Sequence, residues 1–344
     1  MSGKLVYIVA TNLDHAGLRH KILGQLKAFD SSFDAKLHYF KYSHTQSKLI
    51  KLALYLYFEA KSLWHIVQSD YIYVRYDPKA MITNLACCLI SKKKKIILEH
   101  NAIFEFTLKT LNRPMEKKLH MFWLNRFNKR SIVHAGVSRE IQENLISHGI
   151  PIQNTMAIQN GYEPFVGNAE LINKDVVETV RTLKTTYKKV AIFVGNGYAW
   201  HGVDQLVAIF VNHPECALVL VGNCESVDTS DSIVFVGPQN LNTIHALYPH
   251  CDFGIGGFNN ALNKRTLVSH LKVVEYLCNG LAVLVNNDES ASEIPALRPF
   301  IFDYHKDPKN IDTIIQNKLD YDKIKQISLQ ELTWKKQLDK VGKT

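Results

Sequence analysis

The stretch that decides the fold is Lys189–Ala208, KVAIFVGNGYAWHGVDQLVA. It begins with the short apolar run Val190–Val194, which is typical of a buried strand, and continues through a glycine-containing turn, Gly195–Gly197. The next stretch, Val203–Val211, has the 3.6-residue periodicity of a helix. A strand, a tight turn and a helix in this order predict a βαβ unit and therefore a parallel sheet.

The same turn predicts a phosphate site. Glycines let a ligand approach the backbone closely, and the N-terminus of the following helix presents unpaired N–H groups and a positive dipole end to an anion. A plain strand-to-helix turn without a ligand is the alternative. The third glycine of G-x-G-x-x-G and the G-K-[ST] of a P-loop are both missing from the sequence, which disfavours NAD binding and ATP hydrolysis.

Strand and helix signals alternate along the rest of the chain, which predicts an α/β fold with parallel sheets covered by helices on both faces. The helical stretches besides Val203–Val211 are Leu18–Phe29 and Ile141–His148. The expected strands are Leu5–Ala10, Tyr71–Tyr76, Ile96–Leu98, Val190–Val194, Ala217–Val221, Ile233–Val236 and Leu281–Val285.

The chain has 344 residues, which favours two domains over one. Strand–loop–helix openings near Ala10 and Val194 indicate two doubly wound units, and Gly, Pro and polar residues interrupt the periodicity at Asn160–Phe165. We therefore expect domains at 1–163 and 164–322. The helical stretch Ile324–Val341, within 323–344, either caps the second domain or crosses back to the first.

The six cysteines lie mostly in apolar runs and form no C-x-x-C, so we expect reduced core thiols. No uncharged apolar stretch reaches the roughly 18 residues that a membrane span needs, and the opening MSGKLVYIVATN is typical of a first strand. These features predict a cytoplasmic protein. The histidines show no metal-ligand spacing, so we expect no protein-held metal and no other cofactor.

The net charge of +9 is unevenly distributed. Residues 1–160 contain 23 Lys and Arg against 11 Asp and Glu, whereas the remainder of the chain is slightly acidic. A basic first half indicates an anionic partner for that half, such as nucleic acid, anionic lipid headgroups or a pyrophosphate-bearing acceptor. We favour the last two and no nucleic acid, because the basic half lacks stacking aromatics on a recognisable module.

A second informative stretch is Ser269–Val285, SHLKVVEYLCNGLAVLV. It predicts a helix that carries Lys272 and Glu275 and ends at Asn279-Gly280, followed by a buried strand. The Lys–Glu pair is either an ordinary exposed helix pair or a cation for phosphate and a carboxylate for ribose hydroxyls.

Four stretches in this order resemble the retaining glycosyltransferases of family 4, which have the GT-B fold: two Rossmann-like domains facing across a cleft. They are VATNLDHAGLRHKILGQLKAF (9–29), VSREIQENLISHGIPIQNTMAIQNGYE (137–163), VGNGYAWHGVDQLV (194–207) and SHLKVVEYLCNGLAVLV (269–285). The best matches are 131–163 and 188–286. The resemblance implies a hexosyltransferase of polysaccharide biosynthesis that uses a nucleoside diphosphate sugar, with a UDP-sugar favoured.

The resemblance also assigns roles to individual residues. His100 at the end of KKIILEH and Lys272 are the catalytic candidates, His100 at the sugar and Lys272 at the diphosphate. The donor-binding candidates are Gly17, Gly195, Asn196, Gly197, His201, Gly202, Gly237, Pro238, Gln239, Ser269, Leu271 and Glu275. Glu275 matches the ribose-binding carboxylate, and Gly237-Pro238-Gln239 matches the turn at the nucleobase.

Two departures from the family pattern affect this prediction. Many members carry a second glutamate where this chain has Leu267, and a lysine where it has His201. A neutral histidine leaves the phosphate charge to Lys272, Lys264 or Arg265. The rival interpretations are a GT-B sugar-nucleotide epimerase, a phosphorylase, and a non-catalytic subunit that binds sugar nucleotides.

The acceptor is expected on the basic first domain, as a glycan or a saccharide linked to a lipid pyrophosphate. Lys48–Val67 (KLIKLALYLYFEAKSLWHIV) and Lys109–Arg130 combine lysines with large apolar residues, which predicts binding to an anionic membrane surface. The alternative for Lys48–Val67 is an ordinary core helix with a few exposed lysines. The corresponding location is the inner face of the cell membrane, as a peripheral protein.

Overall fold

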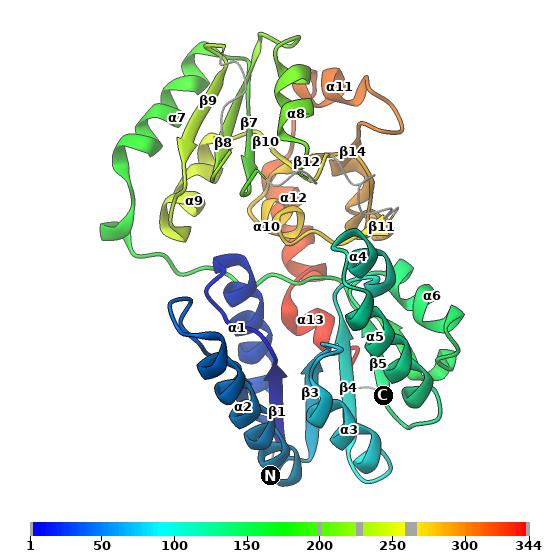
Figure 1. Cartoon of the computed structure of the whole chain (residues 1–344). Helices are drawn as coiled ribbons and strands as arrows, with labels where there is room; N and C mark the ends of the chain where they lie inside the picture. Colours follow the sequence, from blue (N-terminus) through cyan, green and yellow to red (C-terminus); the bar gives the residue numbers. More distant parts are fainter. Residues whose placement is uncertain (1–2, 198–200, 225–229, 259–266, 342–344) are drawn as a thin grey trace. The chain divides into compact units, whose positions relative to one another are not determined.

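The computed structural model describes residues 3–197, 201–224, 230–258 and 267–341. The chain folds into two compact units (Figure 1). Unit 1 contains residues 1–161 and 334–344, and unit 2 contains residues 162–333. The chain thus leaves unit 1 after Gly161, inside the interval in which the sequence predicted a boundary.

Unit 1 is built on a six-stranded parallel sheet with the order β2-β1-β3-β4-β5-β6. The strands are β1 (Lys4–Val9), β2 (Asp34–Tyr39), β3 (Tyr71–Arg75), β4 (Lys95–His100), β5 (Val133–Gly136) and β6 (Thr155–Ala157). The helices are α1 (Ala16–Asp30), α2 (Lys48–Gln68), α3 (Met81–Ile90), α4 (Phe104–Thr110), α5 (Pro114–Phe127), α6 (Arg139–Ser147) and α13 (Trp334–Leu338).

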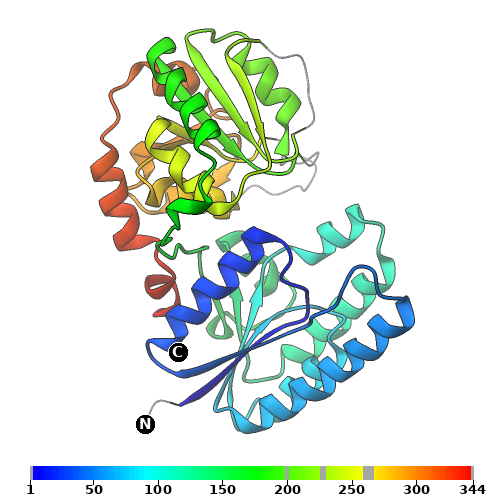
Figure 2. The same cartoon turned by 90° about the vertical axis from the view of Figure 1, so that its left-hand side faces the viewer.

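Alternate residues of each strand pack into two separate cores in unit 1, because successive side chains of a strand point to opposite faces of the sheet. Val6 and Ile8 of β1 join the core that α2, α3, α5 and α6 cover. Leu5 and Tyr7 join the core that α1 and α13 cover. Figure 2 shows α1 in dark blue and α13 in red on one side of this sheet, with the lighter blue and cyan helices on the other.

Unit 2 repeats this plan with the strand order β14-β12-β10-β7-β8-β9, again all parallel. Its strands are β7 (Lys189–Val194), β8 (Cys216–Val221), β9 (Ile233–Gly237), β10 (Phe253–Ile255), β12 (Ala282–Val285) and β14 (Ile301–Asp303), and β11 (Leu267–Val268) pairs with β13 (Asp288–Glu289). Its helices are α7 (Lys174–Thr186), α8 (Val203–Phe210), α9 (Leu241–Leu247), α10 (Leu271–Cys278), α11 (Asn310–Gln316) and α12 (Tyr321–Glu331).

The C-terminal stretch differs from the single helix expected over Ile324–Val341. Helix α12 ends at Glu331, and a separate helix, α13, begins at Trp334. The break lets α12 pack in unit 2 and α13 in unit 1. Trp334 is buried directly against Gly161, where an added Cβ atom would lie 2.7 Å from the indole ring.

Two composition-based expectations can be compared with the described residues. All six cysteines are buried and free, as expected for core thiols. Within the described ranges, no helix is both long and apolar enough to cross a membrane.

Candidate functional site

In unit 2 the ends of β7, β8 and β9 meet at three glycines on the carboxyl edge of the sheet. Gly222, after β8, has φ +122°, and an added Cβ atom would lie only 1.9 Å from the Gly195 carbonyl oxygen. The Gly195 N–H donates to Val221 O (2.9 Å), and the Gly222 N–H donates to Gly237 O (2.9 Å). Only glycine at position 222 permits this approach, so the turns at Gly195 and Gly237 are held in one fixed row.

The turn from β7 to α8 has the backbone geometry that a glycine-containing anion site needs. Gly197 has φ +60° and Gly202, the N-cap of α8, has φ +64°, both in the left-handed region. Asn196 is exposed beside them. Residues 198–200 of the same turn, including Trp200, lie outside the described residues. Among the described residues no side chain caps the N-terminus of α8, so these residues leave its first N–H groups available to a ligand.

Lys272, in the stretch Ser269–Val285, lies beside this turn. Its Nζ lies 3.9 Å from the centroid of the Phe193 ring, and an added Cβ atom on Gly195 would be 3.0 Å from it. The Nζ atom is buried and has no hydrogen-bond partner among the described residues. Burial lowers the pKa of Lys272 to about 7, with Cys224 acting in the opposite direction. A buried ammonium without a hydrogen-bond partner is costly, which marks this position as the candidate place for an anion.

His201 does not supply the charge that the family lysine would. Burial, then the neighbouring charges of Lys272 and His270, lower the pKa of His201 to about 3, so the imidazole is neutral at physiological pH. Lys264 and Arg265, the other candidates for this charge, lie outside the described residues. Lys272 is therefore the cation that the described part of unit 2 places at the Gly195 turn.

Helix α10 is anchored at its start by a pair that sequence reasoning missed. Glu289 of β13 is fully buried and accepts hydrogen bonds from the His270 backbone N–H (2.8 Å) and from His270 Nδ1 (2.8 Å). His270 is the N-cap residue of α10, Ser269 precedes it, and Leu271 is the first residue of the helix. The short β11–β13 pairing, which the sequence did not indicate, is what brings Glu289 to α10.

Glu275 lies one turn further along α10 and contacts a different set of residues from Lys272. Its Oε1 accepts a hydrogen bond from Tyr248 Oη (2.9 Å) and lies 3.1 Å from His245 Nε2. The His245 ring stacks on Phe165 at 4.4 Å. These aromatic neighbours hold the carboxylate in a fixed position, which is a requirement for recognising a ribose diol.

The turn after β9 connects this aromatic group to the glycine row. Gly237 has φ +66°, and an added Cβ atom would meet no atom of the described residues within 4 Å, so these residues leave open space at the turn. Pro238 follows, and Gln239 donates from Nε2 to Val236 O (2.6 Å), which closes the turn. Asn240 then caps α9, the helix that carries His245.

His100, the catalytic candidate of unit 1, is buried in that unit, with 1% of its surface exposed. Its Nε2 lies 3.0 Å from His134 Nδ1, and its ring packs against Tyr76. Burial, followed by the neighbouring His134 and His120, lowers the pKa of His100 well below the usual value. Within unit 1 the side chain contacts other protein groups, and its contact with a donor sugar stays a prediction.

Gly17 lies in the first turn of α1. An added Cβ atom would make only ordinary contact with the His15 ring, at 3.6 Å. The packing of unit 1 therefore does not itself demand glycine at this position. Its role toward the donor stays a prediction.

The carboxyl edge of the unit 1 sheet carries a cavity of about 330 Å³. Arg75, Asp77 and Asn101 line it, and the Nδ2 atom of Asn101 is buried without a hydrogen-bond partner among the described residues. Behind the cavity, Glu99 accepts from Lys21 (2.8 Å) and lies 3.4 Å from Arg75 Nη1. Burial raises the pKa of Glu99, but Lys21 and Arg75 outweigh it and bring the pKa to about 2.

Two charged residues of unit 1, Arg75 and Glu105, have different surroundings. Glu105 is paired, 2.8 Å from His148 Nε2, whereas Arg75 lines the cavity. Asp77 and Asn101 were missed. Asp77 directly follows the predicted strand Tyr71–Tyr76, and Asn101 lies three residues after the predicted strand Ile96–Leu98, near the carboxyl edge where a parallel sheet collects ligand-binding side chains.

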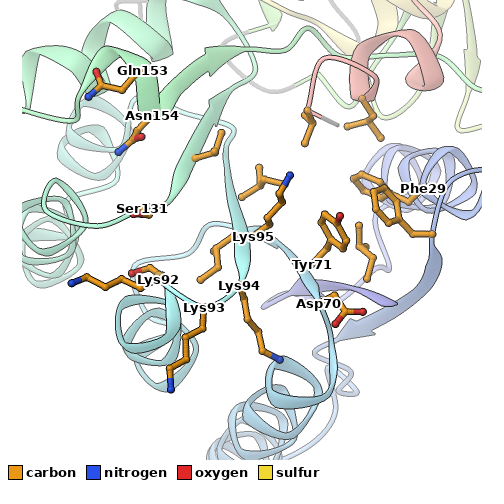
Figure 3. A pocket seen from close by; sticks show the side chains of 18 residues that line it. Phe29, Asp70, Tyr71, Lys92, Lys93, Lys94, Lys95, Ser131, Gln153 and Asn154 are labelled. Atoms are coloured by element: carbon orange, nitrogen blue, oxygen red, sulfur yellow. The ribbon is translucent and has the colours of Figure 1, made fainter. Parts of the chain in front are cut away.

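A second cavity in unit 1, of about 620 Å³, lies at the amino edge of the same sheet. Figure 3 shows its lining, with Lys92 and Lys93 on one side, Tyr71 and Phe29 on another, and Lys95 between them. It contains none of the predicted site residues, and we assign it no part in the candidate site. Across the described ranges, no group of three or more His, Cys, Asp or Glu could hold a metal ion.

Comparison with known proteins finds proteins of similar structure but no protein of similar sequence. No family model matches the chain, and no curated protein matches it in sequence. Among solved structures, HepE from Anabaena in complex with UDP and glucose is 14% identical with a TM-score of 0.65, covering 99% of this chain and 98% of HepE. A glycosyltransferase from Rickettsia africae is 12% identical with a TM-score of 0.62, covering 100% of this chain and 98% of that one.

A UDP-N-acetylglucosamine 2-epimerase from Rickettsia bellii is also similar, at 12% identity and a TM-score of 0.55, covering 100% of this chain and 96% of the epimerase. Glycosyltransferases predominate among the similar structures. At such identities the likeness establishes the fold alone. The two parallel six-stranded sheets with interleaved helices confirm the prediction: the chain has the GT-B fold.

Proposed function

We propose that this chain is a retaining hexosyltransferase that moves a sugar from a nucleoside diphosphate sugar, with a UDP-sugar favoured, to a glycan or lipid-linked saccharide. The observation that carries the proposal is the buried Lys272 ammonium, which lies beside the Gly195 turn without a hydrogen-bond partner among the described residues. A diphosphate at this turn would supply the missing counter-charge.

The fold supports a transferase, because glycosyltransferases predominate among the similar structures and one of them, HepE, was solved with UDP and glucose. The arrangement of unit 2 matches the three parts of such a donor. The glycine turn and Lys272 suit the diphosphate, Glu275 suits the ribose, and the open turn at Gly237–Gln239 suits the base.

The chemistry follows from where charge develops. The bond between the anomeric carbon and the diphosphate oxygen breaks, and a bond from that carbon to the acceptor hydroxyl oxygen forms on the same face. The acceptor proton passes to the departing diphosphate. Lys272 and the N–H groups of the Gly195 turn stabilise the charge on the diphosphate as it leaves, which is the main electrostatic contribution required.

The first experiment is a thermal-shift screen of UDP, GDP, ADP, CDP and TDP. A diphosphate that binds the folded state stabilises it by about 2.7 kcal/mol at a concentration of 100 Kd. We expect UDP to raise the Tm most, and Lys272→Met to reduce the shift to about half or less. If none of the five diphosphates raises the Tm of the wild-type protein, the assignment of a donor site to unit 2 is wrong.

A turnover assay separates the rival functions. Labelled UDP-sugars are incubated with the protein and a mixture of saccharide and lipid-linked acceptors, and UDP release and sugar products are followed. Release of UDP with sugar attached to an acceptor supports transfer. Interconversion of UDP-sugars without UDP release indicates an epimerase, the function of the Rickettsia bellii neighbour. Nucleotide binding with neither product indicates a non-catalytic subunit.

A further inference from the structure

Helix α2 exposes an apolar face. Its buried stripe contains Phe58, Glu59, Ser62 and Ile66. The opposite side carries Leu49, which is 79% exposed, and Trp64, which is 61% exposed. The other exposed large apolar residues of α2 are Ile50, Leu52, Leu56, Tyr57, Leu63 and Val67. A face this apolar on the outside of a helix is the reverse of the usual pattern and indicates an interaction surface.

Helix α3 continues this face. Leu89 is 71% exposed, and Met81, Ile82 and Leu85 are also exposed. The two helices are fixed side by side by Glu59 of α2, whose buried Oε2 accepts from the Thr83 backbone N–H (2.8 Å) and from Thr83 Oγ1 (3.2 Å). The carboxyl group lies at the N-terminus of α3, where burial raises its pKa and outweighs the Thr83 hydrogen bonds, which act to lower it.

Helix α5 adds a third part on the same side of the sheet. Met115 is 70% exposed, and Phe122 is exposed with the Arg126 guanidinium 4.6 Å from its ring. The buried Trp123 of α5 donates from Nε1 to Pro78 O (3.0 Å), just before α3. Figure 2 shows these helices together on the face of unit 1 opposite α1 and α13. We call the exposed residues of these three helices, with Lys92 and Lys93, the α2–α3–α5 surface.

The charge of this surface is one-sided. Residues 48–68, 81–95 and 114–127 contain ten Lys or Arg and two carboxylates, Glu59 and Glu116. Glu59 is only 2% exposed, so it contributes no acidic character outside. Lys61, Lys92, Lys93, Lys117 and Lys118 are exposed among the apolar residues. Lys94 differs from them because its Nζ donates to carbonyl oxygens at the end of α2.

We propose that the α2–α3–α5 surface binds peripherally to an anionic lipid bilayer. Exposed leucines, an exposed tryptophan and interspersed lysines are the chemistry that interfacial helices present to such a bilayer. A second copy of this chain fits less well, because two such surfaces would bring like charges together. The proposal does not depend on glycosyl transfer, since it concerns residues of unit 1 that take no part in the donor site.

Vesicle flotation tests the proposal directly. The full chain is mixed with vesicles of phosphatidylcholine alone or with phosphatidylglycerol added, at low and at high salt. We expect binding to the anionic vesicles at low salt and release at high salt, because surface charges are screened. Wild-type protein that stays in solution with anionic vesicles at low salt would overturn the proposal.

Two pairs of variants test the apolar part. Leu56→Asn with Leu89→Asn should weaken binding about 100-fold, since partial burial of each leucine is worth roughly tenfold. The matched control is Val166→Asn with Leu171→Asn, which are 91% and 56% exposed in unit 2. If the two double variants bind equally, the α2–α3–α5 surface is not the contact.

A second set tests the charge. Replacing Lys61, Lys92, Lys117 and Lys118 by Gln should weaken binding by about fivefold for each lysine. The control replaces four exposed lysines of unit 2 by Gln and should change vesicle binding little; they are Lys174, Lys188, Lys323 and Lys325. Light scattering distinguishes a bilayer from a second copy of the chain as the partner of this surface. If the wild type is a dimer that does not bind vesicles, and Leu56→Asn with Leu89→Asn makes it a monomer, the surface binds a second copy.

Discussion

At the scale of single residues, Lys272 is the position where stability and function oppose each other. Its Nζ is buried without a hydrogen-bond partner among the described residues. Lys272→Met retains most of the unbranched apolar side chain and removes the charge, so it should raise the Tm of the unliganded protein and weaken UDP binding at least tenfold. Calorimetric titration and thermal unfolding measure the two effects. A variant with unchanged UDP affinity would remove Lys272 from the site.

The pH dependence of this effect has a definite sign. The Lys272 pKa is near 10.5 in the unfolded chain, and burial lowers it to about 7 in the folded protein. The cost of the buried charge is therefore complete below pH 7 and decreases as the pH rises toward 10.5. The Tm gain of Lys272→Met over wild type should be larger at pH 6.5 than at pH 9. A gain that grew with pH would contradict the assignment.

Glu275 is more embedded than its sequence context indicated. An ordinary exposed Lys–Glu helix pair was one of the alternatives that the sequence left open, whereas the structure places Glu275 against Tyr248 and His245. Glu275→Ala should weaken UDP binding by about 1.5–3 kcal/mol and also cost about 1–3 kcal/mol of stability, because Tyr248 Oη loses its acceptor.

Tyr248→Phe separates these two effects of Glu275→Ala. This variant removes the hydroxyl and leaves the carboxylate in place, so it should retain most of the UDP affinity. Calorimetry and denaturation of both variants measure the difference. Equal losses of affinity in the two would mean that Glu275 acts only by packing.

At the scale of elements, the row of turns after β7, β8 and β9 depends on one glycine. Gly222→Ala would place a Cβ atom 1.9 Å from Gly195 O at φ +122°. The turns at Gly195 and Gly222 must then move apart. Unit 2 should lose about 2–4 kcal/mol of stability, and its affinity for UDP should fall as well. Gly237→Ala is the matched control. It has φ +66°, and no described residue lies within 4 Å of an added Cβ atom, so we expect only backbone strain of about 1–2 kcal/mol. Denaturation curves that show equal losses would exclude the clash.

At the scale of the whole molecule, the return of the chain to unit 1 depends on Trp334. The indole is buried against Gly161, and the Lys21 Nζ lies 5.5 Å from its ring. Trp334→Ala should cost unit 1 about 3–5 kcal/mol, as expected for a large buried aromatic residue. Trp64→Ala, at an exposed position of α2, should change stability by less than about 0.5 kcal/mol.

Because a two-unit chain need not unfold in one step, saturating UDP is added to hold unit 2 folded during denaturation. The Trp334→Ala transition of unit 1 should then move to lower denaturant while the unit 2 transition stays in place. If both transitions match those of the wild type, α13 contributes nothing to unit 1.

Long apolar runs were predicted well because burial in the middle of a parallel sheet requires them. Val190–Val194 and Ala217–Val221 coincide with β7 and β8 to within a residue. Edge or very short strands were missed. β2, DAKLHY, is only partly buried and mixes charged with apolar residues, and β10 has three residues. Their strand character comes from a neighbouring strand and not from their own composition.

The sequence by itself determined the α/β class, the strand–turn–helix at Gly195 and the helix that carries Lys272 and Glu275, because periodicity and glycine placement are local properties. Only the tertiary structure decided which distant groups meet. It placed Lys272 at Gly195, Glu289 under His270, His100 inside unit 1 and Trp334 against Gly161. These contacts depend on how strands pair and where helices pack, and no pattern along the chain encodes the distance between residues far apart in it.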